Sequence, residues 1–329
     1  MLVFDPAGFP KSGTASVGVA RQWCGRLGKV ANGQVALYVG DVSGVGHPLV
    51  DRRLSVPKAW TTDKARLDQA GVPNAHRGAR SRPPLAVDLW QTSGTRLPPG
   101  WIAGDDEMGR PYWFRRRLAG LGERYRLAVP GNTLVRDLAT ALPEEHGRGR
   151  RPPRPWPRVD AWSASLAEGA WQRGDGRDGC KGPLVVDVVT RRGVARTPRR
   201  QQGDEERFGV LRDRDRDNQP VVQGDFYLST AEPETPLWQF ARVAKAEHRL
   251  EECLQRSKSD AGLADYEVRH GTGWHHHQTL SLLATGFLVT ETLRGKKLDA
   301  SDDGTADTGG HRGGLVQRIS MRDDITYAA

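Results

Sequence analysis

The spacing of apolar residues changes near Pro233, and this change limits the folds that the chain can adopt. Before it, short apolar segments alternate with Gly- and Pro-rich turns, a pattern typical of strands. After it, Val243, Leu250 and Leu254 fall in one stripe at helical spacing, and a Leu-rich second helix is expected over residues 278–293. The pattern therefore predicts strands first and helices last, in a chain of α/β class.

The first two thirds of the chain contain several short segments with strand character. Strands are expected over residues 2–4, 34–39, 48–56, 101–105, 125–129, 183–189, 208–211 and 225–228, and helices over residues 60–70 and 115–121. The first strand is expected to be broken by a turn that starts at Pro6. A basic, Pro-rich segment over residues 144–158 can sustain neither a helix nor a central strand, so it marks a boundary.

This boundary divides the chain into four predicted parts. They are residues 1–143, the first part of a core; residues 144–232, the basic linker and a β-rich insertion; residues 233–295, the last part of the core; and residues 296–329, a tail. The tail is rich in Gly, Asp and Thr without periodicity, so it is expected to be disordered.

The charge of the chain favours a polyanionic partner. The sequence has 49 basic and 40 acidic residues, a net charge of +9 and a pI of about 9.7. Most of the basic residues are Arg, which suits bidentate contacts with phosphate but equally reflects the base composition of a genome. Nucleic acid is therefore the expected partner.

The cysteines and the lengths of the apolar segments indicate the cellular compartment of the protein. Cys24, Cys180 and Cys253 are odd in number and far apart, so they form neither a disulfide framework nor a CxxC metal site. A reducing cytoplasm is expected. No apolar run approaches 18 residues and no export signal begins the chain, so no membrane partner is expected.

Acidic residues lie where predicted elements can converge. Asp5 and Asp105 each follow a short apolar segment, and alternation places Asp105 and Asp106 on opposite faces, so only one of them can face Asp5. On a helical wheel, Glu251 and Lys258 flank the apolar stripe. Taken alone, acidic residues before a Gly commonly form an ordinary turn, and a Glu and a Lys beside an apolar face commonly form a solvated helix edge.

Three converging carboxylates suit Mg²⁺, a hard cation that fills its other positions with water and phosphate oxygens. Two such ions activate an attacking oxygen and stabilise a leaving one. The consecutive residues His275, His276 and His277 invite a zinc interpretation, but neighbouring helical positions diverge by about 100°, so a polar helix start is expected. Gly28 and Lys29 lack the spacing of a phosphate-binding loop.

Three stretches together resemble the motifs of insertion-sequence transposases of the DDE type, within the ribonuclease H-like, retroviral-integrase-like superfamily. The stretches are FDPAGFPKSGTASVGVARQWCG (4–25), WIAGDDEMGR (101–110) and AKAEHRLEECLQRSKSDAGLADYEVR (244–269). In the second motif the Asp lies four residues before a Gly, which selects Asp105. In the third motif a Lys follows the Glu by seven residues, as Lys258 follows Glu251. The similarity is closest to the branch numbered seven-oh-one, related to the group numbered four.

The resemblance implies a ribonuclease H-like mixed sheet flanked by helices, with a β-rich insertion before the Glu-bearing helix. It implies that Asp5, Asp105 and Glu251 bind two Mg²⁺ ions, with Mn²⁺ as an alternative, and that Lys258 contacts a phosphate. The implied reaction is cleavage and strand transfer of DNA, with transposon terminal inverted repeats and target DNA as substrates. The resemblance also allows a homodimer on DNA.

Further DNA contacts are expected outside the three carboxylates. Lys11 lies in the first motif, and Arg148, Arg150 and Arg151 lie in the basic, Pro-rich segment, which is expected to be exposed. These residues and Lys258 are the predicted DNA-binding residues.

Two departures from the family pattern keep alternatives open. The Tyr and Arg that lie seven and four residues before the Glu in the wider group are Ala244 and Glu247 here, and Asp5 follows Met1 by only four residues. A truncated, catalytically inactive DNA-binding remnant of a transposase is therefore the main alternative. A glycosidase with paired carboxylates is a third, but the basic chain and Lys258 suit phosphate better.

Overall fold

The structure is a computed structural model that describes residues 1–98, 100–141, 154–179, 182–214 and 220–302. Residues 1–289 form one compact unit, and α9 continues beyond it. The strands are β1 (Leu2–Pro10), β2 (Ala20–Cys24), β3 (Lys29–Asp41), β4 (Leu49–Leu54), β5 (Trp101–Gly104), β6 (Arg124–Val129), β7 (Val135–Asp137), β8 (Gln172–Gly179), β9 (Gly182–Arg196), β10 (Gln202–Arg214) and β11 (Pro220–Ser229). The α-helices are α1 (Lys58–Thr61), α2 (Lys64–Gln69), α3 (Arg82–Thr92), α4 (Asp106–Gly109), α5 (Tyr112–Gly120), α6 (Val159–Ala164), α7 (Leu237–Ala244), α8 (Ala246–Asp260) and α9 (Gly271–Asp302).

The strands of the described residues form one mixed sheet with the order β2-β3-β1-β5-β6-β11-β10-β9-β7, in which β4 also pairs with β3 and β8 with β9. Strand β3 runs antiparallel to β1, β2 and β4, whereas β1, β5 and β6 are parallel. The order β4-β3-β1-β5-β6, with β3 alone reversed, is the mixed sheet of a ribonuclease H-like fold. The predicted fold class is therefore confirmed.

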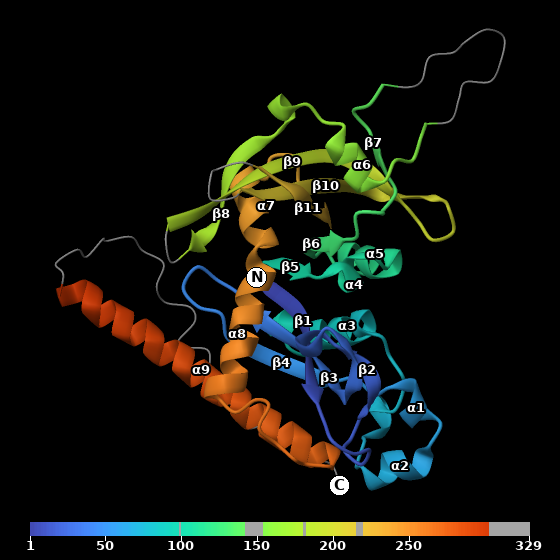
Figure 1. Ribbon diagram of the computed structural model, residues 1–329, viewed down its shortest axis with the longest axis vertical. Coiled ribbons are helices and arrows are strands. Elements are labelled where there is room, and N and C mark those ends of the chain that lie inside the picture. Colours follow the sequence, from blue (N-terminus) through green and yellow to red (C-terminus); the bar gives the residue numbers. More distant parts are fainter. Residues whose placement is uncertain (99, 142–153, 180–181, 215–219, 303–329) are drawn as a thin grey trace. The chain divides into compact units, whose positions relative to one another are not determined.

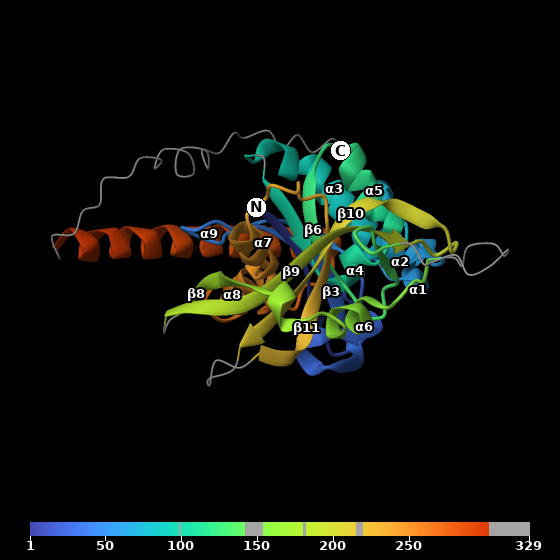
Figure 2. The same ribbon diagram turned by 90° about the horizontal axis from the view of Figure 1, so that it is seen from above.

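Helices cover both faces of this sheet, as Figures 1 and 2 show. Alternation along β1 sends Val3, Ala7 and Phe9 to one face, where they form a buried cluster with residues of α7 and α8. It sends Leu2 and Phe4 to the other face, where they pack with residues of α3 and α5. Each sheet face is thus buried against helices, and Asp5 points toward the face that α8 covers.

The first strand differs from its prediction. It continues through Pro6 to Pro10, whereas a turn was expected at Pro6, so that expectation was wrong. Strand β5 pairs with β1 only as far as Phe4, while β3 pairs with β1 along its whole length. Beyond Phe4, no strand of the described residues pairs with β1 on its β5 side, so a backbone N–H there needs no partner. Pro6, which has no N–H to donate, is therefore tolerated at this position.

The helices also differ from the expected ranges. The expected helix over residues 60–70 is two short helices, because the Asp63 side chain accepts a hydrogen bond from the backbone N–H of Arg66 and starts α2. The last helix begins earlier and ends later than predicted, so the expected tail is helical from residue 296 to Asp302. The remainder of the tail lies outside the described residues.

A β-rich segment lies between β6 and α7, as expected, and its strands are longer than the predicted ones. It joins the core sheet directly, because β11 pairs with β6 from Phe226↔Val129 to Ser229↔Arg126. Its own core contains Trp162 and Phe208, whose ring centroids are 4.6 Å apart. The insertion therefore extends the sheet and is not a separate layer.

A buried ionic network fastens this extension to the helical side of the core. The Arg115 Nε on α5 donates to Glu206 Oε1 on β10 at 2.8 Å, and the Tyr125 hydroxyl on β6 donates to the same oxygen at 2.6 Å. The Arg115 and Glu206 side chains are only 5% and 3% exposed. Because each charge is satisfied by the other, loss of one partner leaves a buried charge without compensation.

We predict that Glu206→Gln lowers the free energy of unfolding by about 3–5 kcal/mol, the usual cost of breaking a buried pair by removing one partner. The matched control is Glu205→Gln on the same strand, whose pair with Arg192 is largely exposed and should contribute less than about 1 kcal/mol. Denaturant unfolding of both variants measures the difference. Equal stability losses would show that the network does not fasten the insertion.

Candidate active site

The site begins with the register of two parallel strands. Phe4 on β1 is paired with Gly104 on β5, so the next residues along these strands, Asp5 and Asp105, are neighbours. Asp105 also caps α4, because its carboxylate accepts the Met108 backbone N–H at 3.2 Å. Two carboxylates are therefore fixed side by side where β5 ends.

Helix α8 brings two more carboxylates to the same face. Leu250 of α8 packs so closely on Gly40 of β3 that a Cβ on Gly40 would collide with it. This contact holds the helix against the sheet at the level of Glu247 and Glu251, which are one turn apart. Glu247 is half-buried, whereas the Glu251 side chain is 60% exposed and its Oε2 lies 3.3 Å from His248 Nδ1.

The four carboxyl groups affect one another electrostatically. The pKa of Asp5 is raised to about 7, first by burial and then by the charges of Glu251 and Asp105. Burial raises the pKa of Glu247 to about 8, with added contributions from Asp105 and Asp5. Burial also raises the pKa of Asp105. We call Asp5, Asp105, Glu247 and Glu251 the carboxylate cluster.

Two basic residues oppose this negative charge. Lys258 and Arg82 both favour the ionised form of Asp5 and so lower its pKa. Lys258 lies on α8 with its Nζ 5.3 Å from the centre of the Phe9 ring, and Arg82 begins α3 and pairs with Glu107. Burial lowers the pKa of the Arg82 guanidinium, and Asp105 and Asp5 oppose that effect.

Asp5, Asp105, Glu251 and Lys258 were predicted from the sequence as site residues. Two further residues near them, Glu247 and Arg82, were not. Glu247 was noted only as a departure from a motif, although it lies one turn before Glu251 and thus on the same helix face. Arg82 gave no usable signal, because α3 was not among the expected helices.

The donor set of the cluster fits a hard divalent cation. Its ligands are carboxylate oxygens, and their crowding is what a bound cation would relieve. Among the described residues, no group of three Asp, Glu, His or Cys side chains has the arrangement needed to hold one metal ion.

An open cleft of about 630 Å³ runs beside the cluster. Its lining includes Glu247 and Glu251 from α8, Asp106, and Asp213 and Asp225 from the insertion. Lys245, which lies between α7 and α8, bridges the last two, with its Nζ 2.8 Å from Asp213 and 3.2 Å from Asp225. The cleft therefore lies between the core and the insertion, and both contribute to its walls.

The predicted DNA-binding residues fall into three groups. Lys258 lies near the cluster. The Lys11 ammonium donates to the Tyr266 carbonyl and lies 3.7 Å from the centre of its ring, so it holds the loop after α8. Arg148, Arg150 and Arg151 lie outside the described residues.

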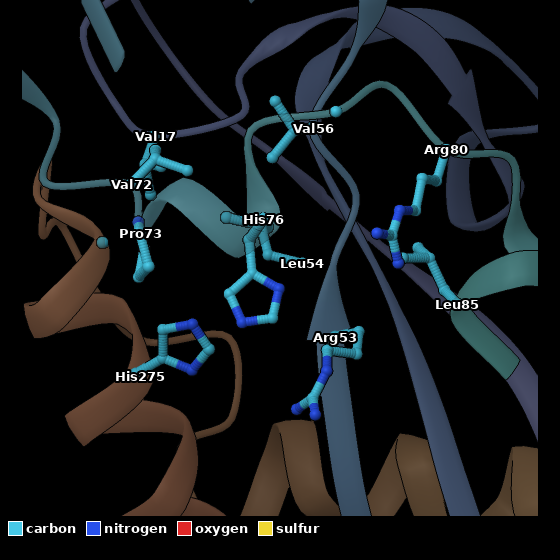
Figure 3. A pocket seen from close by; sticks show the side chains of 12 residues that line it. Val17, Arg53, Leu54, Val56, Val72, Pro73, His76, Arg80, Leu85 and His275 are labelled. Carbon is cyan, nitrogen blue, oxygen red and sulfur yellow. The ribbon is translucent and has the colours of Figure 1, made fainter. Parts of the chain in front are cut away.

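The three consecutive histidines diverge, as the helical interpretation requires. His276 is exposed, His277 Nε2 lies 2.9 Å from the Gly262 carbonyl oxygen, and His275 faces a small, partly open cavity of about 30 Å³ (Figure 3). His76 and Arg53 also line this cavity, whose walls are otherwise largely apolar. It has room for about one water molecule and no carboxylate in its lining, so it is a packing feature and not an active site.

The model of the family described as DDE superfamily endonuclease matches residues 1–183, more than half of the chain. The match includes Asp5 and Asp105 and ends before α8. A comparison with curated proteins gives no match. No helix in the described part of the chain is both long and apolar enough to cross a membrane.

The cavity histidine generates a prediction about acid stability. The pKa of His275 is lowered to about 4, first by burial and then by the charges of Arg52, His76 and Arg53, while Asp51 opposes them. The pKa of His275 is lower in the folded protein than the 6.5 of the unfolded chain. Its contribution to the free energy of unfolding is therefore fully present above pH 6.5, and it is lost as the pH falls toward 4, because the unfolded chain binds the proton more readily.

We predict that stability falls by about 2 kcal/mol between pH 7 and pH 5 because of this group. His275→Gln should remove that part of the acid dependence in denaturant unfolding at the two pH values. The control is His276→Gln on the exposed neighbour, which should retain it. If the two variants have the same pH profile, His275 is not the source.

The carboxylate cluster generates a second prediction. Asp5→Asn removes one of the repelling charges, so it should raise the free energy of unfolding of the metal-free protein by about 1 kcal/mol or more at pH 8, and by less at pH 5, where Asp5 is largely protonated. Divalent cations should raise the melting temperature of the unsubstituted protein, since they bind only the folded form. Asp5→Asn should weaken that rise, and an unchanged rise would show that the cation binds elsewhere.

Proposed function

Because the chain belongs to the DDE superfamily endonuclease family, we propose that it is a transposase that cuts DNA at the ends of an insertion sequence and joins them to target DNA. Endonucleases of this family are metal-dependent enzymes that act on DNA. The observation that carries the proposal is the β1–β5 register, which makes Asp5 and Asp105 neighbours beneath the carboxylates of α8. A homodimer on DNA is part of the proposal.

The proposed cofactor is Mg²⁺, with Mn²⁺ as a substitute, held by Asp5, Asp105 and Glu251. When bound, such ions lower the pKa of the attacking water and stabilise the charge on the leaving oxygen. Asp5 and Asp105 are positioned by backbone pairing, and the Glu251 side chain is exposed on α8 beside His248. The Lys258 ammonium, near Asp5, would contact a phosphate oxygen of the DNA strand.

The proposed reaction is phosphoryl transfer in two stages. Water attacks a phosphodiester at the transposon end and frees a 3′-hydroxyl, which then attacks a phosphodiester of target DNA. The chain orients the phosphodiester through Lys258 and the cleft beside the cluster. The net charge of +9 favours the approach of such a polyanion to an otherwise acidic site.

An inactive DNA-binding remnant is the second candidate, and one observation favours it. Glu247 stands where the wider group has an Arg that contacts phosphate, and it adds a negative charge to the cluster. A phosphodiester that approaches the site meets this carboxylate instead of a guanidinium. If this repulsion dominates, the chain binds DNA without cutting it.

We predict that the protein with Mg²⁺ or Mn²⁺ nicks DNA that carries the ends of its element, and that Ca²⁺ supports binding with little cleavage. Glu251→Gln should reduce cleavage at least about 100-fold, because the amide keeps the shape but not the charge that holds the cation. DNA binding in Ca²⁺ should persist. The matched control is Glu252→Gln on the same helix, beside Arg249, which should retain cleavage.

A gel assay of strand cleavage with both metals separates the candidates. Cleavage that survives Glu251→Gln would contradict the assignment of the third ligand. Binding without any cleavage in either metal would favour the remnant, and Glu247→Arg would then be the variant expected to restore activity.

A further inference from the structure

Two arginines lie over one tryptophan at the edge of the β-rich insertion, and a third arginine is close enough to act on them electrostatically. Arg136 belongs to β7 and Arg196 ends β9, while Arg154 and Trp156 lie in the segment before α6. The Arg136 guanidinium carbon is 4.0 Å from the centre of the Trp156 ring, and that of Arg196 is 5.8 Å away. The Arg136 Nη2 also donates to the Arg154 carbonyl oxygen at 2.9 Å. We call these residues the Trp156 arginine cluster.

This cluster has no acidic partner among the described residues. Its three arginines form no ion pair there, and the buried Nε of each has no hydrogen-bond partner. Burial lowers the pKa of Arg136, and the charges of Arg154 and Arg196 lower it further, so the three groups repel one another. Contact with the Trp156 ring holds the Arg136 and Arg196 guanidinium groups near each other in spite of that repulsion.

Other arginines of the insertion show that this arrangement is not simply a consequence of a basic sequence. Several of them pair with a carboxylate: Arg158 with Asp160, Arg192 with Glu205, and Arg212 and Arg214 with Asp187. At the Trp156 arginine cluster the described residues supply no carboxylate, which leaves its donors open to an anionic ligand.

The geometry of guanidinium groups selects the anion. A guanidinium presents parallel N–H donors that match two oxygens of a phosphate, and such charge-assisted hydrogen bonds are short and strong. A Trp face beneath the guanidinium keeps this plane fixed before the ligand arrives, which reduces the entropy lost on binding. A phosphate group fits these donors.

The sheet order separates this cluster from the catalytic site. Strand β7 lies five strand spacings from β5 in the order β5-β6-β11-β10-β9-β7, a separation of about 24 Å along the sheet at about 4.8 Å per strand. A phosphate bound there is therefore a different one from the phosphate that is cut. Consecutive phosphates of one DNA strand are about 3.4 Å apart along the axis, so a duplex spans this separation within one helical turn.

We propose that the Trp156 arginine cluster binds a backbone phosphate of duplex DNA, away from the bond that the carboxylate cluster cuts. This inference rests on the proposed function for its DNA partner and adds a site that the catalytic motifs do not contain. Because backbone contacts carry no base information, the site acts on any duplex sequence. It anchors the flanking DNA against the insertion.

The experiment measures binding of a fluorescent 30-base-pair duplex of mixed sequence to the full chain in Ca²⁺, over a series of salt concentrations. Replacement of Arg136, Arg154 and Arg196 by Ala should weaken binding about eightfold at 0.1 M salt. The negative slope of log K against log salt should become less steep by about 0.9, the value for one phosphate. Arg154→Ala alone should weaken binding in the same direction. Arg154 donates no side-chain hydrogen bond to the described residues, so this second variant tests the proposal even if the triple variant fails to fold.

A charge-matched control separates a site from a loss of net charge. Arg80, Arg192 and Arg294 each pair with a carboxylate on the surface, and their joint replacement by Ala removes the same charge. That variant should keep the salt slope of the unsubstituted protein. If it loses as much affinity and slope as the cluster variant, the phosphate site is refuted while the proposed function stands. If the unsubstituted protein fails to bind the duplex, both proposals fall.

Discussion

The pairing of Phe4 with Gly104 is the constraint on which the rest of the site depends. It fixes two aspartates at neighbouring positions of parallel strands, where backbone hydrogen bonds and not side-chain contacts determine their separation. That arrangement is unfavourable in the absence of a cation, because burial and mutual repulsion both raise the pKa of Asp5. The packed faces of the sheet supply the stability that makes this placement tolerable.

The helix that completes the site is held by packing and not by charge. Leu250 rests on Gly40, a position that only a residue without a side chain can occupy, and this contact sets the height of Glu247 and Glu251 above the sheet. Arg126 is fully buried, with its guanidinium carbon 3.5 Å from the centre of the Phe240 ring. Its side-chain nitrogens have no hydrogen-bond partner among the described residues. Burial lowers the pKa of Arg126, which reaches about 9 because Tyr227 and Glu247 oppose that effect. A buried cation therefore acts electrostatically on the carboxylate that stands where an arginine was expected.

The insertion links these two regions of opposite charge. It forms one wall of the cleft beside the carboxylate cluster and carries the Trp156 arginine cluster at its far strand. Because β11 pairs with β6, both features belong to one continuous sheet, and the Arg115–Glu206–Tyr125 network fixes that sheet to α5. A rigid connection of this kind would hold the proposed anchoring site and the proposed cutting site at a constant separation, as a duplex of fixed geometry requires.

The sequence by itself determined the α/β class, the change to helical spacing after Pro233, and the positions of Asp105, Glu251 and Lys258 relative to their own elements. These follow from local periodicity and from short motifs, which depend on neighbours in the chain. Only the tertiary structure decided that β1 passes through Pro6, because the open side of that strand depends on where β5 ends, about 100 residues away. It alone decided that Glu247 joins the carboxylates and that Arg136 and Arg196 meet over Trp156, since such encounters arise from strand register and helix packing between segments that are distant in sequence.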